Sequence, residues 1–144
     1  MVSLKDEKGT ELVEFAIVSL LLFLLLFGII EFASLLYNKA MITNASREGA
    51  RAGIVARWDN SESPATWDPL DEGEIAAIVE QYCRDHLISF GSGASPTTVV
   101  TGTTESVTGE RTVTVTYPYS FLVPNLLGAP PMLTLTAVTV MRME

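Results

Sequence analysis

The feature that most limits the fold of this chain is an apolar run near its start. From Phe15 to Ile30 the sequence holds no charged side chain and a single hydroxyl, that of Ser19. As an α-helix the run would rise about 24 Å, slightly less than the roughly 30 Å hydrocarbon core of a bilayer. Apolar residues on both sides make up the difference, so we expect a transmembrane helix over about residues 12–37.

A cleaved secretory signal is the competing interpretation of this run. The run is longer than the usual apolar region of a signal peptide, and no small-residue cleavage site follows it closely. The orientation in the membrane stays open, because lysine and arginine residues flank the run on both sides.

The helical pattern continues beyond the run to about Arg57. No proline occurs before Pro64, and the intervening residues favour helix. A helix over residues 10–57 would be about 72 Å long. A domain made from the remaining residues would have a radius of gyration of only about 12 Å. The protruding half of the helix must therefore pack on a membrane, on other subunits, or on both.

Small residues recur on one face of this expected helix, at Ala45, Gly49 and Gly53. Glycine in a helix interior is destabilising by about 1 kcal/mol relative to alanine. Small side chains at this spacing let two helix backbones approach closely. We therefore interpret these three residues as an interface with another helix.

The rest of the chain, residues 58–144, carries the whole net charge of −8, from eleven acidic and three basic residues. An acidic surface repels phosphate groups, so we exclude nucleic acid as a partner. Periodicity first predicts an amphipathic helix, with Asp68 as its N-cap, Pro69 at its first position and its end near Gly91.

Three strand candidates follow the amphipathic helix, at residues 97–101, 111–119 and 133–143. The apolar phase of the third strand shifts near Ala137, which indicates a β-bulge. Between the last two strands, the apolar residues 118–131 either cover the sheet edge or offer a contact surface. The sequence thus predicts an α+β fold, with a long N-terminal helix and a small domain of one helix on an antiparallel sheet of about three strands.

Residues able to do chemistry are few. Cys83 is the sole cysteine, so no intramolecular disulfide can form, and it is expected to be a small buried residue. His86 is the sole histidine, and with Asp85 and Cys83 it supplies too few ligands for zinc or iron. We expect no enzyme activity, no metal and no cofactor.

Two carboxylates border the apolar run. An ionised glutamate at bilayer depth costs at least about 2.5 kcal/mol unless it is paired. Glu14 and Glu31 would lie about 100° apart around the helix axis, so they do not form one site. Glu14 either reaches the headgroups or has a specific partner. Glu31 either lies in the outer headgroup region or pairs with Lys39 or with an arginine of an adjacent protein.

The stretch GTELVEF, from Gly9 to Phe15, resembles the type IV prepilin cleavage signal, in which a charged leader ends in glycine and a glutamate stands fifth in the mature chain. The stretches GIIEF, NASREGARAGIVA, RTVTVTYPYSFLVP and LTLTAVTVMRME extend the likeness. Together they resemble a TadE-like pilus assembly protein, a minor pseudopilin of the tight-adherence (Flp) type IV pilus system.

This resemblance implies a pilin-like fold with a leader over residues 1–9, a long helix over residues 10–57 and an extracytoplasmic domain over residues 58–144. It also implies cleavage after Gly9 by a prepilin peptidase and N-methylation of Thr10, although pilins more often carry phenylalanine there. Cleavage would create an α-amine on Thr10 with an ordinary pKa of roughly 7.7–8.0, which Glu14 of a neighbouring subunit can neutralise.

The function implied by the resemblance is structural. We expect a component of pilus assembly and cell adhesion in the bacterial inner membrane. Its partners would be prepilin peptidase, other pilins, an inner-membrane assembly platform and membrane lipid. The alternative hypothesis is an unprocessed single-pass anchor that presents a small binding domain outside the membrane.

Overall fold

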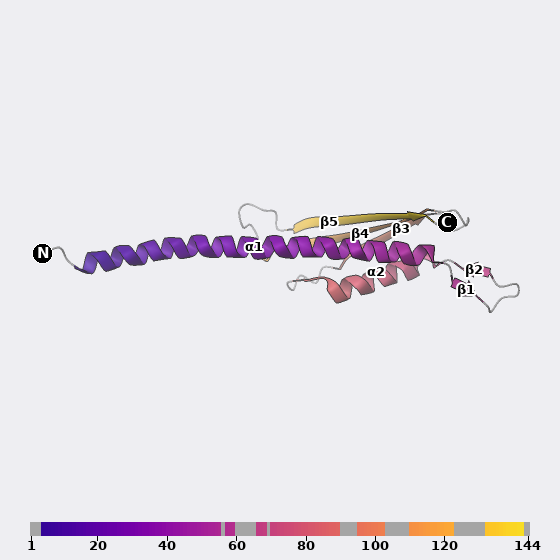
Figure 1. The fold of residues 1–144 in the computed structure, drawn as a ribbon, viewed down its shortest axis with the longest axis horizontal. Coiled ribbons are helices and arrows are strands. Elements are labelled where there is room, and N and C mark those ends of the chain that lie inside the picture. The colour runs from indigo at the N-terminus through magenta and orange to yellow at the C-terminus, as the bar shows by residue number, and fades with distance from the viewer. Residues whose placement is uncertain are drawn as a thin grey trace.

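One helix, α1 (Leu4–Ile54), runs through most of the length of the computed structural model (Figure 1). The structure describes residues 4–55, 57–59, 66–68, 70–89, 95–102, 110–122 and 132–142. The helix begins before Gly9 and stops three residues short of the predicted end at Arg57. Arg57 instead starts strand β1 (Arg57–Asp59), which pairs antiparallel with β2 (Thr66–Asp68) where only turns were predicted.

The second helix, α2 (Glu72–His86), confirms the amphipathic helix but begins later than predicted. Its N-cap is Asp71, because Asp71 Oδ1 accepts a hydrogen bond from the Glu74 amide at 2.6 Å and the Glu74 carboxylate accepts one from the Asp71 amide at 3.2 Å. This reciprocal capping box satisfies two amides that the helix cannot pair itself. The prediction of Asp68 as N-cap was wrong, since Asp68 belongs to β2. The helix ends at His86, and the predicted end at Gly91 lies outside the described residues.

The predicted antiparallel sheet is confirmed, in the order β3-β4-β5. Its strands are β3 (Thr97–Gly102), β4 (Glu110–Ser120) and β5 (Met132–Arg142). Inward-facing side chains alternate along β4, as the sequence predicted for Val113, Val115 and Tyr117.

The bulge predicted near Ala137 is absent from β5. The β4–β5 register runs without a break from the pair Glu110–Arg142 to the pair Ser120–Met132. The apolar residues change from the inner to the outer face after Ala137, but the backbone register does not shift. Thr139 points inward, where its hydroxyl lies 2.7 Å from Ser46 Oγ, and Val138 and Val140 are exposed on the outer face.

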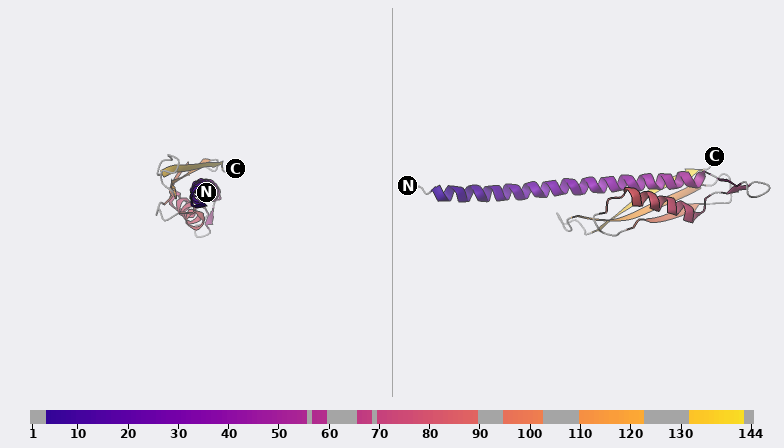
Figure 2. Two further views of the ribbon diagram at one scale, coloured as in Figure 1. Left: turned by 90° about the vertical axis from the view of Figure 1, so that its left-hand side faces the viewer. Right: turned by 90° about the horizontal axis from the view of Figure 1, so that it is seen from below.

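The C-terminal part of α1 lies between the sheet and α2, as the end-on view shows (Figure 2). Its buried residues share one face of the helix and are Glu31, Asn38, Ile42, Ala45, Ser46, Gly49, Ala50 and Gly53. On the facing side, α2 contributes Ile75, Val79 and Cys83, and β4 contributes Val113, Val115, Tyr117 and Tyr119. The core of the domain is therefore built around α1 rather than beside it.

Two glycines of α1 allow α2 to pack this closely. A Cβ placed on Gly53 would lie 2.8 Å from Ile75 Cδ1, and one on Gly49 would come closer still to Val79 Cγ2. The helix that contacts the line of small residues is thus α2 of the same chain.

We expect Gly49→Ala to lower the free energy of unfolding by about 1–3 kcal/mol, because the added methyl group must displace Val79 in a packed core. Gly28→Ala is the matched control, since a Cβ at Gly28 meets no atom within 4 Å. Urea unfolding of the full chain in detergent micelles measures both variants. Equal stability of the two variants would show that the close contact is not needed.

Candidate functional site

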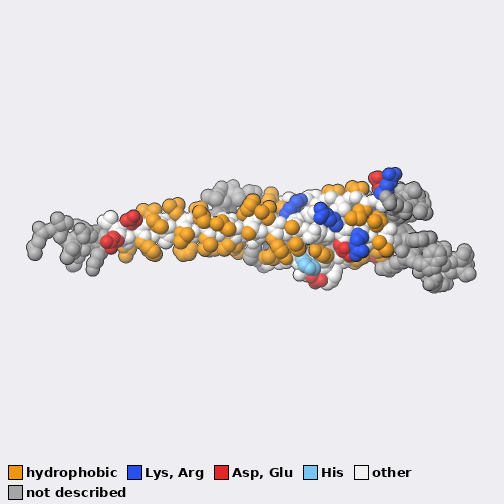
Figure 3. All heavy atoms as spheres, in the orientation of Figure 1, with side chains coloured by type: hydrophobic (Ala, Val, Ile, Leu, Met, Phe, Trp, Pro, Cys, Tyr) orange, Lys and Arg blue, Asp and Glu red, His pale blue; other side chains and the backbone are white. Residues whose placement is uncertain are grey.

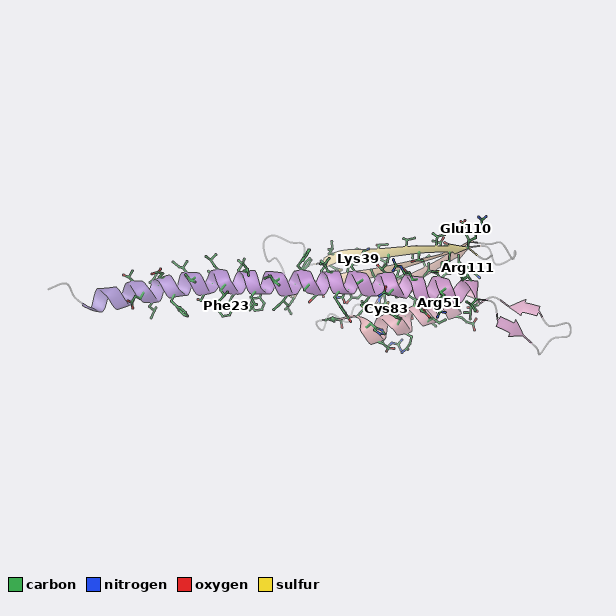
Figure 4. All side chains as sticks on the ribbon, in the orientation of Figure 1. Phe23, Lys39, Arg51, Cys83, Glu110 and Arg111 are labelled. Carbon is green, nitrogen blue, oxygen red and sulfur yellow. The ribbon has the colours of Figure 1, made fainter. Side chains whose placement is uncertain are left out.

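None of the other described residues packs against the N-terminal half of α1. Between Gly9 and Ile30 it extends about 33 Å beyond the domain. Its large apolar side chains are exposed on successive residues, and Figure 3 shows hydrophobic side chains along the face in view. Phe23, for example, projects from the bare helix (Figure 4). The large exposed apolar residues here are Leu12, Val13, Phe15, Ile17, Val18, Leu20, Leu21, Leu22, Phe23, Leu24, Leu25, Leu26, Phe27, Ile29 and Ile30.

This helix is long and apolar enough to cross a membrane, and the apolar window within it is not buried by the rest of the chain. Soluble monomers rarely expose a contiguous apolar surface of this size to water. A lipid bilayer can surround this surface, because its side chains are apolar and the backbone groups of the helix are hydrogen-bonded within the helix. The free half of α1 is therefore the surface of a single-pass membrane protein.

The predicted cleavage and pairing residues lie at the tip of this free half. Gly9, Thr10 and Glu14 are exposed within the helix, and Glu14 lies between the apolar residues Val13 and Phe15. Thr10 and Glu14 are one helical turn apart, as their sequence spacing predicted. Gly9 does not end or start the helix, because α1 begins at Leu4.

Glu31 has different surroundings from those predicted. Its side chain is buried, with 7% of its surface exposed. Glu31 Oε1 accepts a hydrogen bond from the Tyr119 hydroxyl at 2.7 Å, and Oε2 accepts one from the Leu122 amide at 2.9 Å. These polar contacts of Glu31 are with Tyr119 and Leu122 rather than with Lys39, and its position in the outer headgroup region stays a prediction. Tyr119 belongs to the end of β4, and Leu122 follows that strand in the same chain.

Burial, and then the Glu31 carboxylate, raise the pKa of Tyr119 above its ordinary value. The phenol therefore keeps its proton and remains a donor throughout the physiological pH range. A hydrogen bond to a charged acceptor is stronger than one between neutral groups. The contact thus holds the end of β4 against α1 at the point where the helix leaves the domain.

Further polar contacts follow along the same helix. Asn38 is fully buried, and its side chain both donates to the Ile88 carbonyl at 2.8 Å and accepts from the Ile88 amide at 3.0 Å. At the next residue, Lys39, Nζ donates to the carbonyl oxygen of Thr136 in β5 (Figure 4). These contacts join α1 to the segment after α2 and to the edge of the sheet.

Sequence reasoning missed the roles of Asn38 and Tyr119, although a signal for Asn38 was present. The residues Glu31, Leu35, Asn38, Ile42, Ala45 and Gly49 alternate at spacings of four and three. This alternation keeps side chains on one helix face. Polar residues within such a line require buried partners. The partner of Glu31 had no comparable signal, because Tyr119 lies 88 residues away.

Ala45, Gly49 and Gly53 lie on this same inward face and are buried by α2 and the sheet. The face they form is occupied within the chain. The largest apolar surface left exposed among the described residues is the free half of α1.

The described residues assemble no catalytic or metal centre. Cys83 is buried, and burial, followed by the charge of Glu80, raises the pKa of its thiol to about 11, so it is a poor nucleophile. His86 stacks on Tyr82, and its Nδ1 lies 2.9 Å from the Tyr82 carbonyl oxygen. No group of three His, Cys, Asp or Glu side chains in the described part of the chain could hold a metal ion.

Comparison with known proteins gives one match. Residues 9–51 match the family model described as TadE-like protein. This segment covers the free half of α1 and most of the half that packs in the domain. No curated protein and no solved structure matches the chain.

We expect Tyr119→Phe to lower the free energy of unfolding by about 1.5–3 kcal/mol, because it removes a donor from a buried carboxylate. Tyr37→Phe, which alters a partly exposed ring on α1, should change it by less than about 0.5 kcal/mol.

A double-mutant cycle tests the contact itself. Tyr119→Phe, Glu31→Ala and the double variant should show a coupling energy between about 0.5 and 3 kcal/mol in urea unfolding. Strictly additive effects would show that the two side chains do not stabilise each other.

Proposed function

From the match of residues 9–51 to the TadE-like family model, we propose that this chain is a minor pseudopilin required for assembly of a tight-adherence (Flp-type) pilus. The observation that carries the proposal is the free half of α1, which is apolar on all sides and carries Glu14 near its tip. Lipid covers this half before assembly. Helices of other pilins replace the lipid in the assembled structure.

The proposal places the protein in the bacterial inner membrane with its C-terminal domain outside the cytoplasm. Its partners are prepilin peptidase, other pilins or pseudopilins, and the assembly platform of the same membrane. The role is structural, as the buried thiol of Cys83 and the hydrogen-bonded ring of His86 also favour.

Processing is the first step of the proposal. The family match begins at Gly9, the residue after which the peptidase would cut. Gly9 lies inside α1, so the turn around it must open before the peptide bond becomes accessible. Glycine eases this opening, because it lowers helix stability by about 1 kcal/mol relative to alanine.

Subunit pairing is the second step. Cleavage turns the peptide nitrogen of Thr10 into a cationic α-amine, and Glu14 of a neighbouring subunit accepts it. A carboxylate within lipid is unfavourable by at least about 2.5 kcal/mol when unpaired, so pairing rewards a defined axial offset between helices. The rest of the interface is the apolar surface of the free half, since the inward face of the C-terminal half is already occupied.

The processing step predicts that protein extracted from native membranes lacks residues 1–9 and begins at Thr10, with or without one added methyl group. Intact-mass measurement reads this directly. Gly9→Val should retain the leader, because the larger side chain blocks cleavage. A functional native protein that still carries Met1 would instead support an unprocessed anchor that presents its domain outside the membrane.

The pairing step predicts that Glu14→Gln leaves cleavage and membrane insertion intact but reduces the yield of pili by about tenfold or more, since 1.4 kcal/mol changes an equilibrium constant tenfold. Glu11→Gln is the matched control, because Glu11 is also exposed near the tip but stands second rather than fifth after the proposed cleavage site. Electron microscopy and quantified surface pilin measure the effect. Normal piliation by the Glu14→Gln strain would contradict the pairing.

A further inference from the structure

We propose that the end of the C-terminal domain nearest the free half of α1 is itself a lipid-binding surface, embedded in the headgroup region of the membrane that α1 crosses. We call this surface the base. It consists of Phe32, Leu36 and Tyr37 on α1 and of Leu122, Met132 and Leu133 on the sheet. The inference depends on α1 crossing a membrane and not on the proposed role in a pilus.

The hydrogen bonds of Glu31 define where the domain starts along α1. They bring Tyr119 and Leu122 to the level of Glu31. The strand register then brings the start of β5 to the same level, because Tyr119 pairs with Leu133 and Ser120 pairs with Met132. No linker separates helix and domain, since α1 continues unbroken into the core.

The apolar surface of α1 does not end where the domain starts. Beyond Glu31, on the sides that the domain leaves uncovered, Phe32 is 63% exposed, Leu36 51% and Tyr37 40%. The first cationic residue after them is Lys39. Six residues from Glu31 to Tyr37 rise about 9 Å along the helix. Over this distance the domain covers one side of α1, while the other sides still expose apolar side chains.

This arrangement requires either that apolar side chains remain in water or that the base enters the membrane. Entry of the base into the membrane agrees with the depth at which apolar and aromatic side chains insert at a membrane interface. Amphipathic helices that lie on membranes bury their apolar face about 5–10 Å into the headgroup and acyl boundary. Aromatic side chains such as Phe32 and Tyr37 favour that depth, where an apolar ring meets polar headgroups.

The side chains that the sheet presents at this level are also suited to lipid. Leu122, Met132 and Leu133 are 40%, 58% and 37% exposed. The described residues of this end of the sheet and just after β4, residues 118–122 and 132–134, contain no charged residue. The opposite ends of the same two strands carry the pair Glu110 and Arg142, which lies far from the free half of α1 (Figure 4). The polarity of the sheet thus changes along the membrane normal.

The chain offers a matched pair of positions to test the proposal. Met132 and Val140 both point to the outer face of β5 and are 58% and 56% exposed. They are eight residues apart, which corresponds to about 27 Å along a strand. In a Cys83→Ser background, each is replaced by cysteine in the full chain and labelled with an environment-sensitive fluorophore. The labelled proteins are then reconstituted in phosphatidylethanolamine and phosphatidylglycerol vesicles.

Two quenchers distinguish the possible surroundings of each label. A nitroxide on lipid headgroups should quench the label at Met132→Cys several-fold more than the label at Val140→Cys, and aqueous iodide should show the reverse order. Equal quenching of both labels by iodide would overturn the proposal, because the base would then stand in water. Protection of Met132→Cys from both quenchers would also overturn it, since another protein rather than lipid would cover the base.

A substitution that alters no label position provides a second measurement. Tyr37→Asp places a charge at the expected headgroup depth on a side of α1 that the domain leaves exposed. It should weaken nitroxide quenching at Met132→Cys. Asn44→Asp, on an exposed part of α1 beyond the base, should not change it. An unchanged signal in Tyr37→Asp would contradict the embedded base.

Discussion

The packing of one face of α1 against the domain is the interaction on which the rest of this structure depends. The buried face runs from Glu31 to Gly53, about 33 Å along the helix. The domain cannot form a core without it, because α2 and the sheet make their apolar contacts largely through this helix. The described residues of the domain do not cover the other half of the same helix. A single element is therefore both the core of the domain and the membrane segment.

Polar contacts define the axial position of the domain on this helix. Apolar packing on small residues alone would allow the domain to shift along α1, because similar alanine and glycine surfaces recur at regular spacings on the helix. Glu31 and Asn38 do not permit it, since each has specific partners and a buried polar group without a partner is unfavourable by about 1–3 kcal/mol. These contacts thereby determine how much of α1 remains for the membrane.

The two carboxylates beside the apolar run have opposite roles for the same physical reason. A charge near lipid needs a partner. Glu31 has its partners within the chain, Tyr119 and the Leu122 amide, so it contributes to folding. Glu14 lies on the uncovered half of the helix, where the domain supplies no side chain. Glu31 thus determines where the domain begins along α1, and Glu14 is the carboxylate that we propose for subunit pairing.

The sequence by itself determined the elements whose signals are local. The long helix, the amphipathic α2 and the three strands follow from periodicity within a few turns or residues. Even the error at Asp68 was local, because Asp71 with Glu74 is the better capping pair. Only the tertiary structure decided the partners of Glu31, the unbroken register at Ala137 and the burial of Gly49 against Val79. Each of these depends on a segment distant in the sequence, and periodicity reports which face of an element is apolar but not what will cover it.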